Sequence, residues 1–166
     1  MILIRIMGGA FLVVSGALAG IFLCERLKAR ADFMGQYAQF LSQAQAVIGY
    51  TASSAGELFR SAGGVPLLKP MLDNAVELMN GGMDLKEAWR VSVDSYVKNG
   101  RDRQLLYYFG ETFGTSNIEG ELSKLALQRE NAEKLYGEYL EEVRSKKKLY
   151  RTVGMFCGAM AAALLI

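Results

Sequence analysis

The feature that most constrains this chain is the lack of charge at both of its ends. No acidic residue occurs before Glu25 or after Glu142, and Arg5 is the only basic residue before Arg26. Of the whole sequence, 51% is hydrophobic and 22% is charged, and nearly all of the charged residues lie in a middle block. This distribution predicts a membrane segment at each end of a mostly polar, helical middle block.

The N-terminal apolar segment, Ile6 to Leu23, has about 18 residues without a charge. As a helix it would be ~27 Å long, which is close to the ~30 Å thickness of the hydrocarbon core of a bilayer. We expect an uncleaved membrane anchor. The alternative is a signal peptide, because Ala17-Leu18-Ala19 has the small-x-small pattern of a cleavage site, and cleavage after Ala19 would release an exported helical binding module. The apolar run continues through Leu23, which favours the anchor.

The C-terminal apolar segment, Thr152 to Ile166, is shorter and would form a helix of ~22 Å. An uncharged tail without a polar face is hard to cover in so small a domain, so we expect a second membrane segment. Both segments contain a GxxxG pair, which lets another helix approach closely and makes a homo-oligomer plausible. The four glycines are Gly16, Gly20, Gly154 and Gly158.

Basic residues flank both segments on the side of the middle block, where they are expected to lie at the membrane interface. They are Arg26, Lys28, Arg30, Arg144, Lys146, Lys147, Lys148 and Arg151. The positive-inside rule places such flanks in the cytoplasm, next to anionic headgroups. The predicted organisation is a transmembrane segment over residues 1–24, a cytoplasmic helical bundle over 25–151 and a second transmembrane segment over 152–166.

The middle block carries helix signals throughout. Leu27, Met34, Leu41 and Ile48 recur every seven residues and predict one long helix continuous with the first apolar segment. Glycine pairs, prolines and capping-box spacing at Asp84–Glu87 and Ser116–Glu119 then predict short helices before a long helix that begins near Ile118. Asn99-Gly100 is expected to stop the helix that Asp84 opens. The short helices are expected over residues 53–60, 66–79, 84–98 and 101–113. We therefore predict an all-α fold, an antiparallel bundle whose first and last helices continue into the bilayer.

The residues offer little for catalysis. The chain has no histidine, and Cys24 and Cys157 are too few for a metal site or a disulfide framework. A net charge of +2 is too small for a nucleic-acid-binding face. We expect no enzyme activity, no cofactor, no metal and no nucleic-acid partner. Trp89 is expected to anchor the core, and the acidic residues with a possible role in partner binding are Glu111, Glu119 and Glu121.

Several segments, taken in order, resemble the stage III sporulation protein AB family of endospore-forming bacteria. They are Ile48-Gly49-Tyr50, Lys86-Glu87-Ala88-Trp89, Phe109 to Gly114, Leu125-Ala126-Leu127 and the basic stretch with its Gly-containing tail from Lys146 to Ile166. The chain departs from the family at Val47, where an acidic residue is frequent, and at Ser53-Ser54-Ala55, where Thr-Pro-Leu is frequent.

The resemblance implies a role that periodicity does not supply. Members of the family belong to a secretion-like channel between mother cell and forespore, and they are similar to the platform proteins of type II secretion and type IV pilus systems. The implied protein is a membrane platform on the mother-cell side of that channel. Its implied partners are the channel's cytoplasmic secretion-type ATPase and the other membrane subunits of the channel.

Overall fold

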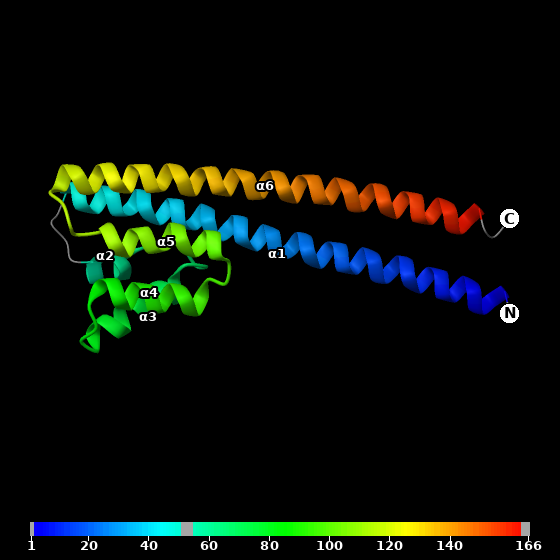
Figure 1. Cartoon of the computed structure of the whole chain (residues 1–166), viewed down its shortest axis with the longest axis horizontal. Helices are drawn as coiled ribbons and strands as arrows, with labels where there is room; N and C mark the ends of the chain where they lie inside the picture. Colours follow the sequence, from blue (N-terminus) through cyan, green and yellow to red (C-terminus); the bar gives the residue numbers. More distant parts are fainter. Residues whose placement is uncertain (1, 51–54, 164–166) are drawn as a thin grey trace. The chain divides into compact units, whose positions relative to one another are not determined.

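The computed structural model describes the backbone of residues 2–50 and 55–163, and the side chains of residues 22, 24–48 and 55–149. Every helix or strand within the described backbone is an α-helix, which confirms the predicted all-α class. The helices are α1 (Ile2–Tyr50), α2 (Ala55–Ser61), α3 (Lys69–Asn80), α4 (Leu85–Tyr96), α5 (Gly100–Thr112) and α6 (Ile118–Ala163), as labelled in Figure 1.

The chain divides into two compact units, and both long helices contribute to each of them. Unit 1 comprises Met1–Ala31 and Gly137–Ile166, and unit 2 comprises Asp32–Tyr136. This is a division by spatial compactness, separate from the membrane boundaries predicted at residues 24 and 152. The predicted continuity of the first and last helices is confirmed over residues 2–50 and 118–163.

Within the part of the chain that the structure describes, no helix is both long enough and apolar enough to cross a membrane. The two apolar segments predicted from the sequence, residues 6–23 and 152–166, lie outside the residues whose side chains are described, except for Phe22. The same holds for the predicted packing glycines Gly16, Gly20, Gly154 and Gly158, and for Arg151.

The core of unit 2 is built on the predicted stripe of α1. Met34 and Leu41 are fully buried, and so is Phe40, which lies on the same helix. Four aromatic rings from four helices meet here, namely Phe40, Phe59, Trp89 and Phe109, with ring centroids 4.8–6.4 Å apart. Aromatic side chains bury large apolar areas and favour stacked, tilted and edge-on pairs such as these, so this cluster joins α1, α2, α4 and α5.

A second part of the same core is polar. The Gln128 Nε2 of α6 donates hydrogen bonds to the Tyr37 hydroxyl of α1 at 2.7 Å and to the Leu105 carbonyl of α5 at 2.9 Å. Tyr37 and Gln128 are both buried. Because a buried amide is destabilising unless it is hydrogen-bonded, this network favours one relative placement of α1, α5 and α6 in unit 2.

The helix ends confirm some of the predicted signals and correct two others. The predicted cap at Asp84 is confirmed, since its carboxylate accepts a hydrogen bond from the Glu87 amide at 3.2 Å. Asn99 was expected to stop the preceding helix, yet it caps α5, accepting from the amides of Arg101 and Asp102. The predicted Ser116–Glu119 capping pair was also wrong, because Asn117 caps α6 by accepting from the Gly120 amide at 3.0 Å.

Unit 1 contains those basic residues next to the apolar segments whose side chains the structure describes. Arg30 of α1 stacks on the ring of Tyr139 of α6, with its guanidinium carbon 4.3 Å from the ring centroid, and also donates to the Tyr139 hydroxyl at 2.6 Å. Lys146 pairs with Glu142 one turn earlier on α6, at 2.6 Å. The Arg30 contact with Tyr139 fastens α1 to α6 in unit 1, and the ion pair within α6 orders the Lys146 side chain.

Candidate functional site

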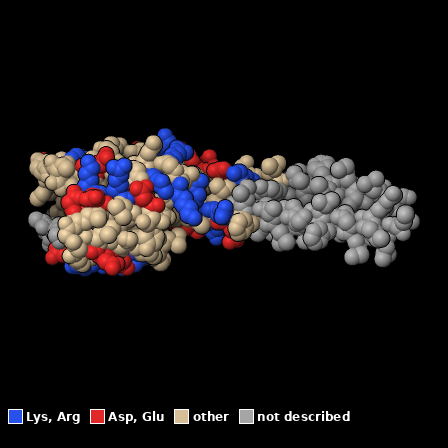
Figure 2. Space-filling view, turned by 60° about the horizontal axis from the view of Figure 1, so that its bottom comes forward, with Lys and Arg blue, Asp and Glu red and all other residues tan. Residues whose placement is uncertain are grey.

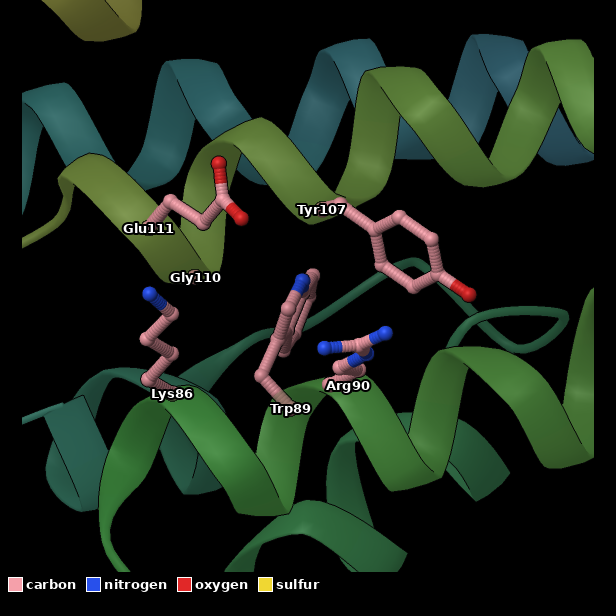
Figure 3. Close-up of a pocket in the computed structure, with 6 residues that line it drawn as sticks. All are labelled: Lys86, Trp89, Arg90, Tyr107, Gly110 and Glu111. Atoms are coloured by element: carbon pink, nitrogen blue, oxygen red, sulfur yellow. The ribbon is translucent and has the colours of Figure 1, made fainter.

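Unit 2 has a pocket, a notch between α4 and α5 with a volume of about 110 Å³. It is lined by Lys86, Trp89 and Arg90 of α4 and by Tyr107, Gly110 and Glu111 of α5. On each helix the three positions are spaced i, i+3 and i+4, so each helix presents one face to the notch. Figure 3 shows the two faces opposed, with Trp89 between the side chains of Lys86 and Arg90.

The inner wall of the notch is a close contact between Trp89 and Gly110. The Trp89 indole is fully buried, and its Nε1 donates a hydrogen bond to the Leu106 carbonyl at 2.7 Å. A Cβ atom added at Gly110 would come within 2.6 Å of Trp89 Cδ1. Glycine at 110 therefore allows α5 to lie directly against the indole, and it keeps the floor of the notch open.

The rim carries two cations and one carboxylate. Lys86, Arg90 and Glu111 are all exposed, and Figure 3 shows Lys86 and Glu111 on one side of Trp89 and Arg90 on the other. The Arg90 guanidinium carbon lies 5.8 Å from the centroid of the Tyr107 ring. Within the described part of the chain, no ion pair or hydrogen bond engages the charged groups of these three rim residues.

The position of Tyr107 is fixed from the side away from the rim. Its hydroxyl donates a hydrogen bond to the Asp94 carboxylate, which also lies 3.5 Å from the Arg103 guanidinium. The hydrogen bond to Asp94 holds the phenol in its protonated form and raises the pKa of Tyr107 above its ordinary value. Asp94 is thus engaged by Tyr107 and Arg103, and it forms no ion pair with Arg90.

The three acidic residues considered for partner binding have different surroundings. Glu111 lines the notch and Glu119 is exposed in the first turn of α6. Glu121, in contrast, is only 6% exposed. Its carboxylate accepts a hydrogen bond from the Ser116 amide at 2.9 Å and lies 3.8 Å from the Lys124 ammonium. Glu121 therefore stabilises the turn before α6, and only Glu111 belongs to the notch.

The predicted interface basic residues also differ from one another. Arg30 and Lys146 are engaged by Tyr139 and Glu142, as described above. Arg26 lies over the Phe22 ring, with its guanidinium carbon 5.0 Å from the centroid. The remaining described members, Lys28, Arg144, Lys147 and Lys148, have exposed side chains.

The sequence analysis did not single out Lys86, Arg90 or Gly110 as site residues. The available signal was the repeated i, i+3, i+4 spacing on two neighbouring helices, with a glycine on one and a tryptophan on the other. Two segments that carry the family resemblance, Lys86 to Trp89 and Phe109 to Gly114, both contribute to this notch.

The chemistry of the notch suits binding, since it offers an aromatic wall and charged side chains at its rim. Among the described residues, no group of three or more cysteine, aspartate or glutamate side chains could hold a metal ion.

Comparison with known protein families identifies a family for this chain. A family model described as stage III sporulation protein AB matches residues 5–166, nearly the whole chain. No curated protein and no solved structure matches the chain.

Proposed function

This chain belongs to the stage III sporulation protein AB family, and we propose that it is a non-enzymatic platform subunit of the membrane channel between mother cell and forespore. In this proposal the two apolar end segments anchor the protein in the mother-cell membrane. The helical bundle of residues 25–151 lies in the cytoplasm and docks a secretion-type ATPase. Family membership places the chain in stage III of sporulation; the platform and docking roles are the proposal.

The observation that carries the proposal is the continuity of α1 and α6. Residues 6–23 lie within a helix that runs to Tyr50, and the apolar tail is helical as far as Ala163 in a helix that begins at Ile118. A helix satisfies its own backbone hydrogen bonds, as a segment in a bilayer must. The same two helices supply buried residues to the core of unit 2, so each links an apolar end to the bundle.

The charges of the flanks support the cytoplasmic placement. Lys28, Arg144 and Lys147 have exposed side chains beside the apolar segments, as the positive-inside rule requires of cytoplasmic flanks. Arg30 and Lys146 are less available for contacts with lipid headgroups, because Arg30 is bonded to Tyr139 and Lys146 is paired with Glu142.

Cysteine accessibility tests the topology. In a chain with Cys24→Ser and Cys157→Ser, single cysteines at Ser95 and Ser123, both exposed, report on the bundle. We expect a membrane-impermeant maleimide to label them only after the membrane is permeabilised. Labelling in intact cells would contradict the cytoplasmic placement. The mass of the mature N-terminus separates the anchor from the exported alternative, which requires loss of residues 1–19.

Genetic deletion and co-purification test the role. A clean deletion is expected to block sporulation after engulfment, and the full chain in lipid nanodiscs is expected to retain the channel's ATPase on an affinity column. Normal spore yield in the deletion strain, or no retention of the ATPase by the wild-type chain, would contradict the platform role.

A further inference from the structure

We propose that the notch between α4 and α5 is a docking site for an acidic segment of a protein partner. In this arrangement a glutamate or aspartate of the partner pairs with Arg90 and Lys86, and an apolar neighbour of that residue rests on Trp89 and Gly110. The inference rests on the proposed function to the extent that the expected partner is the channel's ATPase.

The size of the notch fits a single anchoring side chain. A volume of about 110 Å³ admits one side chain of ordinary size, and its aromatic wall is already in place. Binding energy at protein interfaces concentrates where one side chain enters such a preformed pocket. Gly110 maintains this shape, because a Cβ there would meet Trp89 at 2.6 Å.

The charges at the rim favour an acidic occupant. Lys86 and Arg90 outnumber Glu111, and none of these three charged groups has a hydrogen-bond or ion-pair partner within the described part of the chain. Asp94, the nearby acid on α4, is already engaged by the Tyr107 hydroxyl and by Arg103. In Figure 2 basic and acidic side chains are interspersed over the face shown, so charge selectivity has to come from a local arrangement such as this one.

Arg90 is oriented before a partner arrives. Its guanidinium lies near the face of Tyr107, at 5.8 Å from the centroid, and Asp94 in turn fixes Tyr107. A guanidinium held by an aromatic ring loses less side-chain entropy when it pairs with a carboxylate. Glu111 on the opposite helix disfavours a multiply charged phosphomonoester more than a single carboxylate, which favours an aspartate or glutamate over a phosphorylated side chain as the occupant.

The single tryptophan provides a direct readout of the notch. The chain contains one tryptophan, so a full chain labelled with 5-fluorotryptophan gives one ¹⁹F resonance, that of residue 89. Titration of the labelled chain in nanodiscs with the unlabelled ATPase is expected to shift or broaden this resonance. Carbodiimide coupling, which joins an amine to a carboxylate in direct contact, is expected to link Lys86 to an aspartate or glutamate of the ATPase.

Charge variants then test the pairing. Arg90→Glu and Lys86→Glu are each expected to weaken ATPase binding by about tenfold or more, because each places a like charge against the incoming carboxylate. Lys98→Glu is the matched control: it makes the same charge change at an exposed residue outside the notch and should alter affinity less than about twofold. Lys86→Arg should retain binding and abolish the coupled product. Circular dichroism of each variant verifies its helix content.

The outcomes distinguish the two proposals. If the wild-type chain binds the ATPase but both charge reversals bind it equally well and the ¹⁹F resonance stays fixed, the notch proposal fails and the platform role stands. If the wild-type chain does not bind the ATPase, both fail. A resonance that moves with phosphatidylglycerol vesicles alone, or with the concentration of the chain alone, would replace the protein partner with a lipid surface or a second copy.

Discussion

The two parts of the unit 2 core are held together by different physics. One part joins α1, α2, α4 and α5 through four aromatic rings, and the other joins α1, α5 and α6 through the Gln128 hydrogen bonds to Tyr37 and Leu105. Burial of aromatic rings is strongly stabilising but tolerates small shifts of the helices. A buried hydrogen bond adds about 1 kcal/mol, but a shift that breaks it is costly.

The polar character of the α1–α6 contact extends beyond Gln128. Gln45 of α1 donates to the Leu122 carbonyl at 3.3 Å and accepts from the Arg129 guanidinium at 3.4 Å. The aromatic part should therefore supply most of the stability, and the polar part should determine how α6 is aligned along α1. The predictions below test this division, beginning with the largest expected effect.

Trp89→Ala should have the largest effect on stability. It removes the indole that contacts Phe40, Phe59 and Phe109, together with the hydrogen bond to the Leu106 carbonyl. We expect a loss of about 3–5 kcal/mol in the free energy of unfolding, measured by urea denaturation of the full chain in detergent with far-ultraviolet circular dichroism. Trp89→Phe retains a ring and should lose less. Equal stability of Trp89→Ala and the wild type would show that the aromatic part is not the main source of stability.

Gly110→Ala should destabilise the protein by about 1–3 kcal/mol, because its Cβ would overlap with the Trp89 ring and Trp89 Cβ. Gly137→Ala is the matched control, since no atom lies within 4 Å of a Cβ added there. In that helical position alanine should instead stabilise by about 0.5–1 kcal/mol. Thermal unfolding of the two variants gives the sign of each change, and shifts of the same sign would exclude a close contact at Gly110.

Gln128→Met retains most of the side-chain volume but leaves the Tyr37 hydroxyl buried without its donor. We expect a loss of about 1–3 kcal/mol. Combining it with Tyr37→Phe should restore part of the loss, since the unpaired hydroxyl is then removed. A double-mutant cycle by urea denaturation measures the coupling, and strictly additive effects would show that the bond does not link the two helices energetically.

Alkaline pH should give the smallest effect. Burial raises the pKa of the Tyr37 hydroxyl well above its ordinary value. The folded chain therefore keeps this proton at a pH where the unfolded chain has lost it. The stabilisation is complete below about pH 10 and declines by up to ~1.4 kcal/mol per pH unit above it, until the pH reaches the raised pKa. Tyr37→Phe should show a flatter decline in denaturation curves recorded between pH 9 and pH 11; the same slope in both proteins would contradict this origin.

The sequence predicted the helices well where apolar periodicity was long. The stripe from Leu27 to Leu41 is buried as expected, and Gly82 and Gly114 have positive φ in the turns that end the short helices. It failed at the two asparagine caps. Asn99 precedes a glycine and can close one helix or open the next, and at Asn117 the capping residue lies one position later than predicted. Local sequence did not distinguish these possibilities, because asparagine is favoured both just after a helix and as an N-cap, and serine and asparagine are both good N-caps.

The notch was only partly predictable. Trp89 was expected to anchor the core and is fully buried, and Glu111 was among the residues considered for partner binding. The pairing of Lys86 and Arg90 with Tyr107 and Gly110 depends on which faces of α4 and α5 meet. Helical spacing places residues on a face but does not determine the face of the neighbouring helix. Burial of Glu121 depends in the same way on the turn before α6.

The separation of Tyr37 from Gln128 by 91 residues has a consequence for synthesis of the protein. A ribosome releases α1 long before α6, so the polar part of the core cannot close until residue 128 has emerged. The aromatic cluster needs only residues up to Phe109 and can assemble earlier. Ribosome-bound chains from which Phe109 has emerged but Gln128 has not should therefore already bury Trp89 and still lack the hydrogen bond to the Tyr37 hydroxyl.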